Sequence, residues 1–315
     1  MHQRAKNILE TLSWFDMFSY PLRAEEVFWY LINSETTLEA QVAEDEQNQV
    51  VNALKDLLAG SKIGLENELY FLAGRAETVT VRVARQLESF KKIKRAQKVA
   101  RILSAAPFVR AVALCNVLGY FNADAEDDID FFIITKSGRI WTARLVVVWL
   151  FKILGLRPNK KTIKNKFCFS FFVSEDNLNL ENLKLKNDPY LIWWLAGLLV
   201  LWEEKGVFET FLKANAWNKK YLPNFLNRYL SAEVNEWRLG GAAGINFLKR
   251  LGENILGMVS EKIFRFLELK IMPQKIKELM NKTPGVVVND KILKFHLNDT
   301  REKLANNYAE KIKEL

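Results

Sequence analysis

Two aspartates of this 315-residue chain, Asp128 and Asp130, have the spacing of paired metal ligands. They stand two residues apart at the start of Ile129–Thr135, an apolar run typical of a buried strand. Side chains alternate between the two faces of a strand, so both carboxylates point to the same side. Two anions held that close repel each other, and a bound divalent cation relieves the repulsion. The spacing therefore predicts a cation site.

The rest of the composition favours oxygen ligands for that cation. The chain has two histidines and two cysteines, and Cys115 and Cys168 lack the paired spacing of a zinc site. A site made mainly of oxygen ligands favours Mg²⁺ or Mn²⁺. We expect both thiols to be buried and reduced, as in a cytoplasmic protein.

The apolar pattern around the aspartates predicts a small α+β unit. Short apolar runs predict strands, and longer runs with helical spacing predict helices before and after the second strand. Helices on both sides of short buried strands indicate a mixed sheet covered by helices. The expected strands are Phe108–Leu114, Ile129–Thr135 and Phe167–Val173, and the expected helices are 82–104 and Arg139–Leu154.

The stretch from about residue 85 to 175 resembles the DNA polymerase beta-like nucleotidyltransferase superfamily. That family has a Gly-Ser pair after a first strand, then a loop, then Asp-hydrophobic-Asp on the next strand. Here Asp128 and Asp130 match the last motif, eleven residues precede it, and Cys115-Asn116 stands where Gly-Ser should be. The resemblance implies that Asp128 and Asp130 are the catalytic, metal-binding pair, with Mg²⁺ or Mn²⁺ as cofactor. It also implies that Cys115 and Asn116 bind nucleotide, and that a nucleoside monophosphate passes from an NTP to an acceptor.

Two departures from the family pattern bear on turnover. Cys115 adds bulk where the backbone should approach phosphate closely, although the Asn116 amide could still donate a hydrogen bond to a phosphate oxygen. The third strand holds no acid at the place of the family's third carboxylate, and Ser170 is expected there. These departures leave open an alternative: a degenerate domain that binds nucleotide or RNA without turnover.

Other polar residues are weaker candidates. Arg144, just after the second strand, could reach a triphosphate, so we assign it to nucleotide binding, with a place on a solvated helix face as the alternative. Near the C-terminus, the polar cluster at His296 and 298–301 predicts a helix start. A role for this cluster in binding the acceptor, a small molecule or RNA, is the alternative.

The flanking regions predict a three-part chain. Residues 1–80 read as three helices and a hairpin, which indicates a winged-helix-like domain. Residues 81–185 hold the nucleotidyltransferase-like core, and 186–315 read as a helical C-terminal domain. A winged helix suggests a DNA-binding regulator as a second alternative. Duplex DNA is an unfavourable partner, however, because the third helix, Gln47–Leu58, follows Glu44-Asp45-Glu46 and carries Lys55 as its one basic residue.

Charge is unevenly distributed along the chain, and its apolar stretches are short. Residues 1–80 carry 6 basic and 13 acidic side chains, against 40 and 24 in the rest, so an acidic head precedes a basic body. The two longest apolar stretches are Leu145–Leu156, interrupted by Lys152, and Tyr190–Trp202. A membrane span needs roughly 20 residues, so both predict buried helices and no transmembrane segment is expected.

Overall fold

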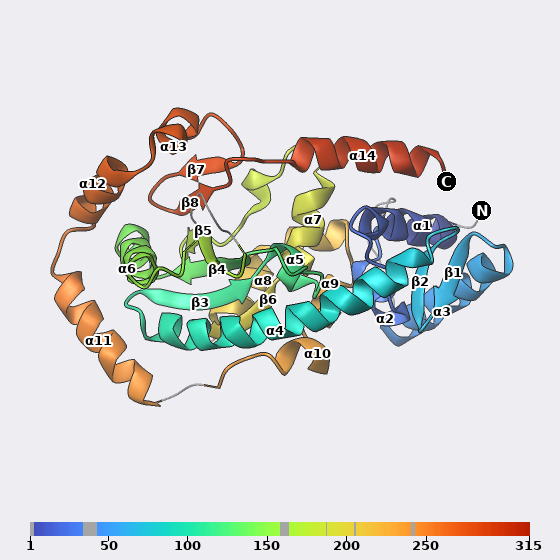
Figure 1. Cartoon of the computed structure of the whole chain (residues 1–315), viewed down its shortest axis with the longest axis horizontal. Coiled ribbons are helices and arrows are strands. Elements are labelled where there is room, and N and C mark those ends of the chain that lie inside the picture. Colours follow the sequence, from blue (N-terminus) through green and yellow to red (C-terminus); the bar gives the residue numbers. More distant parts are fainter. Residues whose placement is uncertain (1–2, 34–42, 158–163, 187, 205, 241–242) are drawn as a thin grey trace.

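A computed structural model describes residues 3–33, 43–157, 164–186, 188–204, 206–240 and 243–315 (Figure 1). At one end, three helices and a hairpin form the head. At the other, a mixed sheet is wrapped by helices (Figure 1). No helix among these residues is long and apolar enough to cross a membrane.

The head has the elements expected from the sequence. Its elements are α1 (Gln3–Asp16), α2 (Ala24–Tyr30), α3 (Ala43–Ala59), β1 (Ile63–Glu66) and β2 (Leu69–Leu72). The hairpin turn lies at Asn67 and Glu68, and both have positive φ angles, 51° and 62°. A two-residue turn of this kind matches the twist of the two paired strands. The winged-helix comparison itself remains a prediction.

The central sheet has the strand order β6-β3-β4-β5-β8-β7. β4 and β5 run parallel, and the other neighbouring pairs are antiparallel. The strands β3 (Val109–Leu114) and β4 (Ile129–Thr135) carry almost unbroken apolar runs because helices cover both of their faces. The strands are β3 (Val109–Leu114), β4 (Ile129–Thr135), β5 (Phe167–Ser174), β6 (Leu199–Glu203), β7 (Val286–Val288) and β8 (Ile292–Phe295).

The two faces of the sheet are covered by different helices. On one face, Phe131 stacks on Phe169, which in turn contacts Phe151 of α6. On the other, Phe132 contacts Trp194 of α7 and Phe211 of α8. Asp130 precedes Phe131 on the strand, so strand alternation places its carboxylate on the face covered by α7 and α8.

The helices and short 3₁₀ segments outside the head connect and cover these strands. They are α4 (Glu77–Ala105), α5 (Asn116–Gly119), α6 (Ile140–Ile153), η1 (Glu181–Leu183), α7 (Pro189–Ala196), α8 (Val207–Ala214), η2 (Ala216–Lys220), α9 (Phe225–Arg228), α10 (Ala232–Asn235), α11 (Ala243–Gly257), α12 (Glu261–Ile271), α13 (Gln274–Leu279) and α14 (Arg301–Lys313).

The expectation of a helical region over 186–315 is wrong in one respect, because this region contributes three strands to the central sheet. The apolar run Tyr190–Trp202 is not one buried helix: α7 ends at Ala196, and the chain turns through Gly197 into β6. A short apolar run fits a buried helix or a buried strand equally well, and only its pairing with β3 settles which one forms. The other stretch, Leu145–Leu156, is helical to Ile153, but Ile153 is 75% exposed, so its end is not buried.

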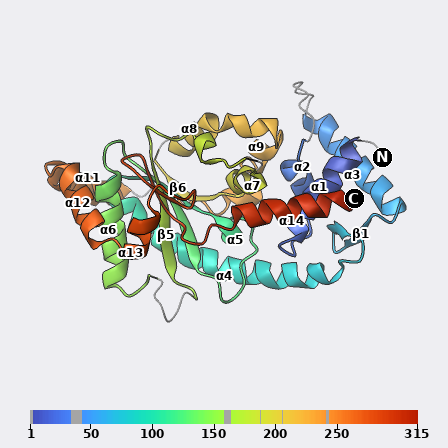
Figure 2. The same cartoon turned by 90° about the horizontal axis from the view of Figure 1, so that it is seen from above.

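Two helices tie the head to the sheet. The long α4 runs from the head along the sheet, and α14 returns to lie beside α1 (Figures 1 and 2). Arg82 of α4 pairs with Glu26 of α2 at 2.8 Å, with both side chains 3% exposed. Lys311 of α14 pairs with Asp16 of α1 at 2.6 Å. These two ion pairs, one buried and one half-buried, help to anchor the head.

Candidate functional site

The carboxylates of Asp128 and Asp130 meet as the spacing predicts. An oxygen of each lies within 4.8 Å of the other and of the Cys168 sulfur, and all three side chains are half-buried. No other three His, Cys, Asp or Glu side chains of the described chain come this close. β4 and β5 bring them together, because Asp130 pairs with Cys168 in the parallel ladder.

The electrostatics of this cluster favour a cation. Burial, and then the negative charge of Asp130, raise the pKa of Asp128 to about 7. Burial and the two aspartates raise the pKa of the Cys168 thiol well above its ordinary value, so the thiol is protonated at neutral pH. A protonated thiol is a poor ligand, whereas two carboxylates are suitable ligands for Mg²⁺ or Mn²⁺. The two carboxylates fit such an ion, and its binding would relieve the repulsion between them.

Asn116 holds Asp130 in place. Its amide Nδ2 donates to Asp130 Oδ2 at 2.7 Å. Its Oδ1 accepts from the Tyr190 hydroxyl at 2.9 Å and from Trp194 Nε1 at 3.1 Å. Its φ of 56° lies in the left-handed region, which asparagine tolerates better than most residues. In the structure the Asn116 amide orients Asp130, a candidate metal ligand. The expected hydrogen bond from Asn116 to a phosphate oxygen remains a prediction.

Cys115 faces the interior. Its side chain is 3% exposed, and its sulfur lies 3.7 Å from the backbone oxygen of Asp130. Burial raises the pKa of its thiol well above the ordinary value, so the thiol stays neutral. The side chain therefore packs under the β3–α5 turn, and the expected role of Cys115 in nucleotide binding remains a prediction.

The loop before Asp128 is fixed by its own polar groups. The Lys92 side chain of α4 is buried and donates to the Asp127 backbone oxygen at 2.6 Å. Asp124 accepts from the backbone N–H groups of Glu126 and Asp127 at 2.8 and 3.2 Å. Glu126 pairs with Lys164 at 2.6 Å. The carboxylates of Asp124 and Glu126 are therefore engaged in shaping the loop.

A close approach of α5 and the end of α7 positions Asn116 beside Tyr190 and Trp194. A Cβ added to Gly119 would lie 2.0 Å from the backbone oxygen of Gly197. We expect Gly119→Ala to push the two elements apart and to lower the free energy of unfolding by about 1–3 kcal/mol. Urea unfolding measures this. Gly257→Ala, where an added Cβ meets nothing within 4 Å, is the control and should change stability by far less. Equal effects of the two variants would contradict the tight contact.

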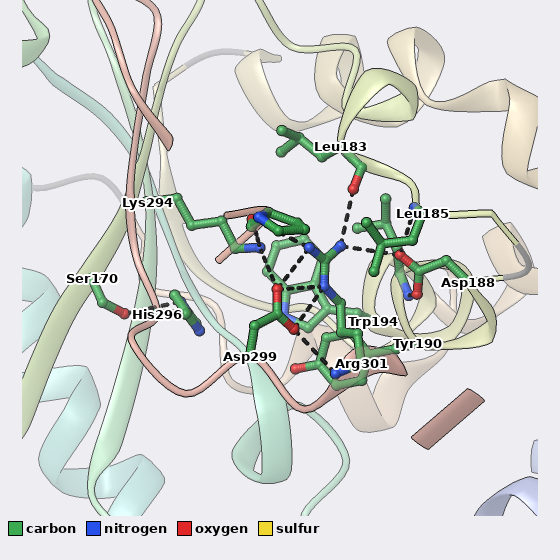
Figure 3. A network of polar contacts seen from close by, with 12 residues as sticks. Ser170, Leu183, Leu185, Asp188, Tyr190, Trp194, Lys294, His296, Asp299 and Arg301 are labelled. Carbon is green, nitrogen blue, oxygen red and sulfur yellow. Dashed lines mark hydrogen bonds and ion pairs between the residues drawn. The ribbon is translucent and has the colours of Figure 1, made fainter. Parts of the chain in front are cut away.

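The third strand brings Cys168, and not Ser170, next to Asp130. An irregularity in the β4–β5 register follows this pair, so counting residues along the strand misplaces the neighbour. Ser170 Oγ lies instead 3.2 Å from His296 Nε2, at the end of β8 (Figure 3). Burial, and then the charge of Lys294, lower the pKa of His296, which favours the neutral imidazole.

The predicted helix start near the C-terminus is confirmed, because α14 begins at Arg301. Arg301 is 4% exposed and pairs with Asp299 at 2.8 Å and with Asp188, the N-cap residue of α7, at 3.0 Å (Figure 3). It also donates to the Leu183 oxygen at 2.9 Å. This network joins α14 to α7, the helix that carries Tyr190 and Trp194.

Arg144 is engaged away from the aspartate pair. Its guanidinium forms an ion pair with Glu268 of α12 and lies 4.3 Å from the ring centre of Phe295. It lines a separate cavity with Lys152 and Arg157. The structure does not bring Arg144 into the Asp128–Asp130 cluster, and its role in nucleotide binding stays a prediction.

Sequence reasoning missed three residues of the site: Cys168 as a neighbour of Asp130, and Tyr190 and Trp194 as partners of Asn116. Tyr190 and Trp194 stand four residues apart, which is the spacing of one helix face, within a segment expected to be helical. That spacing could have identified them as a pair. Their contact with Asn116, more than 70 residues away, carries no local signal.

Comparisons with known proteins give no further information about the site. No family model matches the chain, no curated protein matches it, and no solved structure matches it.

Proposed function

We propose that the protein is a divalent-cation-dependent nucleotidyltransferase, with Asp128 and Asp130 holding Mg²⁺ or Mn²⁺. The observation that carries the proposal is the half-buried pair at the start of β4, where burial, and then the negative charge of Asp130, raise the pKa of Asp128 to about 7. Without a metal, the repulsion between two such carboxylates destabilises the folded protein. A bound cation relieves this repulsion, and the two carboxylates then form a rigid set of ligands.

The residues around the pair suit this role. Asn116 fixes the orientation of the Asp130 carboxylate, and Lys92 fixes the loop from which Asp128 emerges. When bound, the cation would neutralise phosphate charge and orient the nucleotide. The protein then mainly positions its substrates, which is what a site on rigid strands does well.

A second candidate function is nucleotide binding without turnover. The specific observation in its favour is the thiol of Cys168 beside Asp130, where the resemblance would lead one to expect a third carboxylate. A protonated thiol neither holds a second cation nor accepts the proton of an attacking hydroxyl. The two candidates share the nucleotide–metal site and differ only in product formation.

Calorimetry with each NTP, with and without Mg²⁺, tests the shared site. We expect binding that requires Mg²⁺ and is lost in Asp128→Asn/Asp130→Asn, while the exposed control Asp56→Asn binds as wild type does. Magnesium-dependent release of pyrophosphate would then favour transfer over binding alone. Binding that ignores Mg²⁺, or that survives in the double variant, would contradict the proposal.

A further inference from the structure

A cavity of about 210 Å³ lies between the head and the sheet. Trp14 and Phe18 from α1 and its following turn form one wall, and Tyr190 and Trp194 of α7 form another. Leu304 of α14 lines it as well. The walls are thus mostly aromatic rings, and the size suits a small ring better than a drug-sized molecule.

One buried polar group of the cavity lacks a partner. Asn122 is 6% exposed, and its Nδ2 donates to the backbone oxygen of Phe18 at 3.1 Å. Its Oδ1 is buried without a hydrogen bond. A buried acceptor left unsatisfied is costly, so this oxygen favours a ligand that offers a hydrogen-bond donor.

The cavity adjoins the candidate metal pair. Asn116 lines it and donates to Asp130 at 2.7 Å. The Tyr190 hydroxyl in its wall already donates to Asn116 Oδ1. A ligand in the cavity would therefore be separated from the Asp128–Asp130 pair by one side chain, that of Asn116. Few polar groups of the cavity wall would be left to form hydrogen bonds with this ligand.

From these features we infer that the cavity binds the acceptor of the transfer: a small, flat, largely apolar ring with one hydrogen-bond donor for Asn122 and a hydroxyl group as nucleophile. The acceptor role rests on the proposed function, whereas the binding of such a ring does not. A nucleobase suits the cavity less, because its several polar edge atoms would be buried with too few partners.

The step implied for this acceptor balances as follows. The hydroxyl oxygen forms a bond to the α-phosphorus of the NTP, and the bond from that phosphorus to the pyrophosphate oxygen breaks. Pyrophosphate leaves with the electron pair, and the hydroxyl proton passes to solvent. The head, which contributes Trp14 and Phe18, then has a function in selecting the acceptor.

Two isomeric probes test the cavity on the wild-type protein without nucleotide or metal. 3-Methylindole keeps the ring N–H, and 1-methylindole has the same size but no donor. By calorimetry we expect 3-methylindole to bind at least tenfold more tightly. Equal affinities, or no binding of either isomer, would overturn the proposed recognition.

Variants and a competition experiment complete the test. Leu304→Trp should fill the cavity and abolish 3-methylindole binding, while Leu297→Trp, at an exposed position outside it, should leave binding within twofold of wild type. Unchanged binding by Leu304→Trp would contradict the location. Saturating 3-methylindole should leave Mg²⁺–NTP affinity within twofold. Competition between 3-methylindole and the NTP would instead assign the cavity to the nucleobase and would contradict the acceptor role. If none of the NTPs binds, the proposed function is refuted, but the binding of the ring in the cavity is not.

Discussion

Asp128→Asn should make the metal-free protein more stable and should remove its response to magnesium. The substitution takes away one of two half-buried carboxylates whose oxygens lie within 4.8 Å of each other. We expect the free energy of unfolding at pH 8 to rise by about 1 kcal/mol. A stabilising change at a site built for function is typical of ligand pairs that strain the empty protein.

The pH dependence should change with it. The pKa of Asp128 is raised in the folded protein from 3.8 to about 7, so the folded state binds a proton that the unfolded chain has lost. Wild-type stability without metal should therefore decline as pH rises through this window, and Asp128→Asn should lack that decline. Saturating Mg²⁺, at about 100 times its Kd, should stabilise wild type by about 2.7 kcal/mol and the variant by far less.

Urea unfolding at several pH values, with Mg²⁺ or with EDTA, measures these effects. Asp56→Asn, at an exposed position of α3, is the matched control and should behave as wild type. A loss of stability in metal-free Asp128→Asn, or an undiminished magnesium response, would argue that the pair is a structural feature and not a cation site.

The second large effect is expected at the buried contact between the head and α4. Arg82→Met should lower the free energy of unfolding by about 3–5 kcal/mol, because it leaves the buried Glu26 carboxylate without its nearest cation, and the Arg23 guanidinium lies farther away at 3.6 Å. In wild type, Arg82 also donates to the Pro21 oxygen, and Tyr20 donates to Glu26 at 3.1 Å. Removing the cation thus disrupts a network, not one isolated pair.

Two comparisons make this prediction specific. Arg265→Met removes the exposed pair with Asp290 and should cost at most about 1 kcal/mol. Glu26→Gln/Arg82→Met removes both buried charges and should recover part of the loss. Since the charge of Arg82 holds the pKa of Glu26 below its ordinary value of 4.5, this pair should stabilise wild type above that pH and lose its effect as pH falls below it. A cost for Arg82→Met as small as that for Arg265→Met would contradict the buried pair.

Local patterns were sufficient to predict the elements around the aspartates. The bounds of β4 coincide with the predicted Ile129–Thr135, and the predicted head helix Gln47–Leu58 lies within α3. Strong apolar periodicity and turn residues act over short distances, so they can be read from neighbouring residues alone.

Long-range pairing explains what the sequence did not reveal. β6 was concealed in an apolar run that also suits a helix, and β7 and β8 are too short to stand out. The neighbour of Asp130 depends on an irregular register, so Cys168 takes the place expected for Ser170. Asn116 looked free to bind phosphate until Tyr190 and Trp194 were placed against it by tertiary packing.

Titration of the protein with Mn²⁺, followed by electron paramagnetic resonance, shows whether Asp128 and Asp130 bind a divalent cation. The signal of free Mn²⁺ should fall as wild-type protein is added, with excess Mg²⁺ restoring it. The Asp128→Asn/Asp130→Asn protein should leave the signal of free Mn²⁺ almost unchanged. Loss of the free signal to the same extent with both proteins would show that Mn²⁺ binds elsewhere. It would contradict a cation site at Asp128 and Asp130.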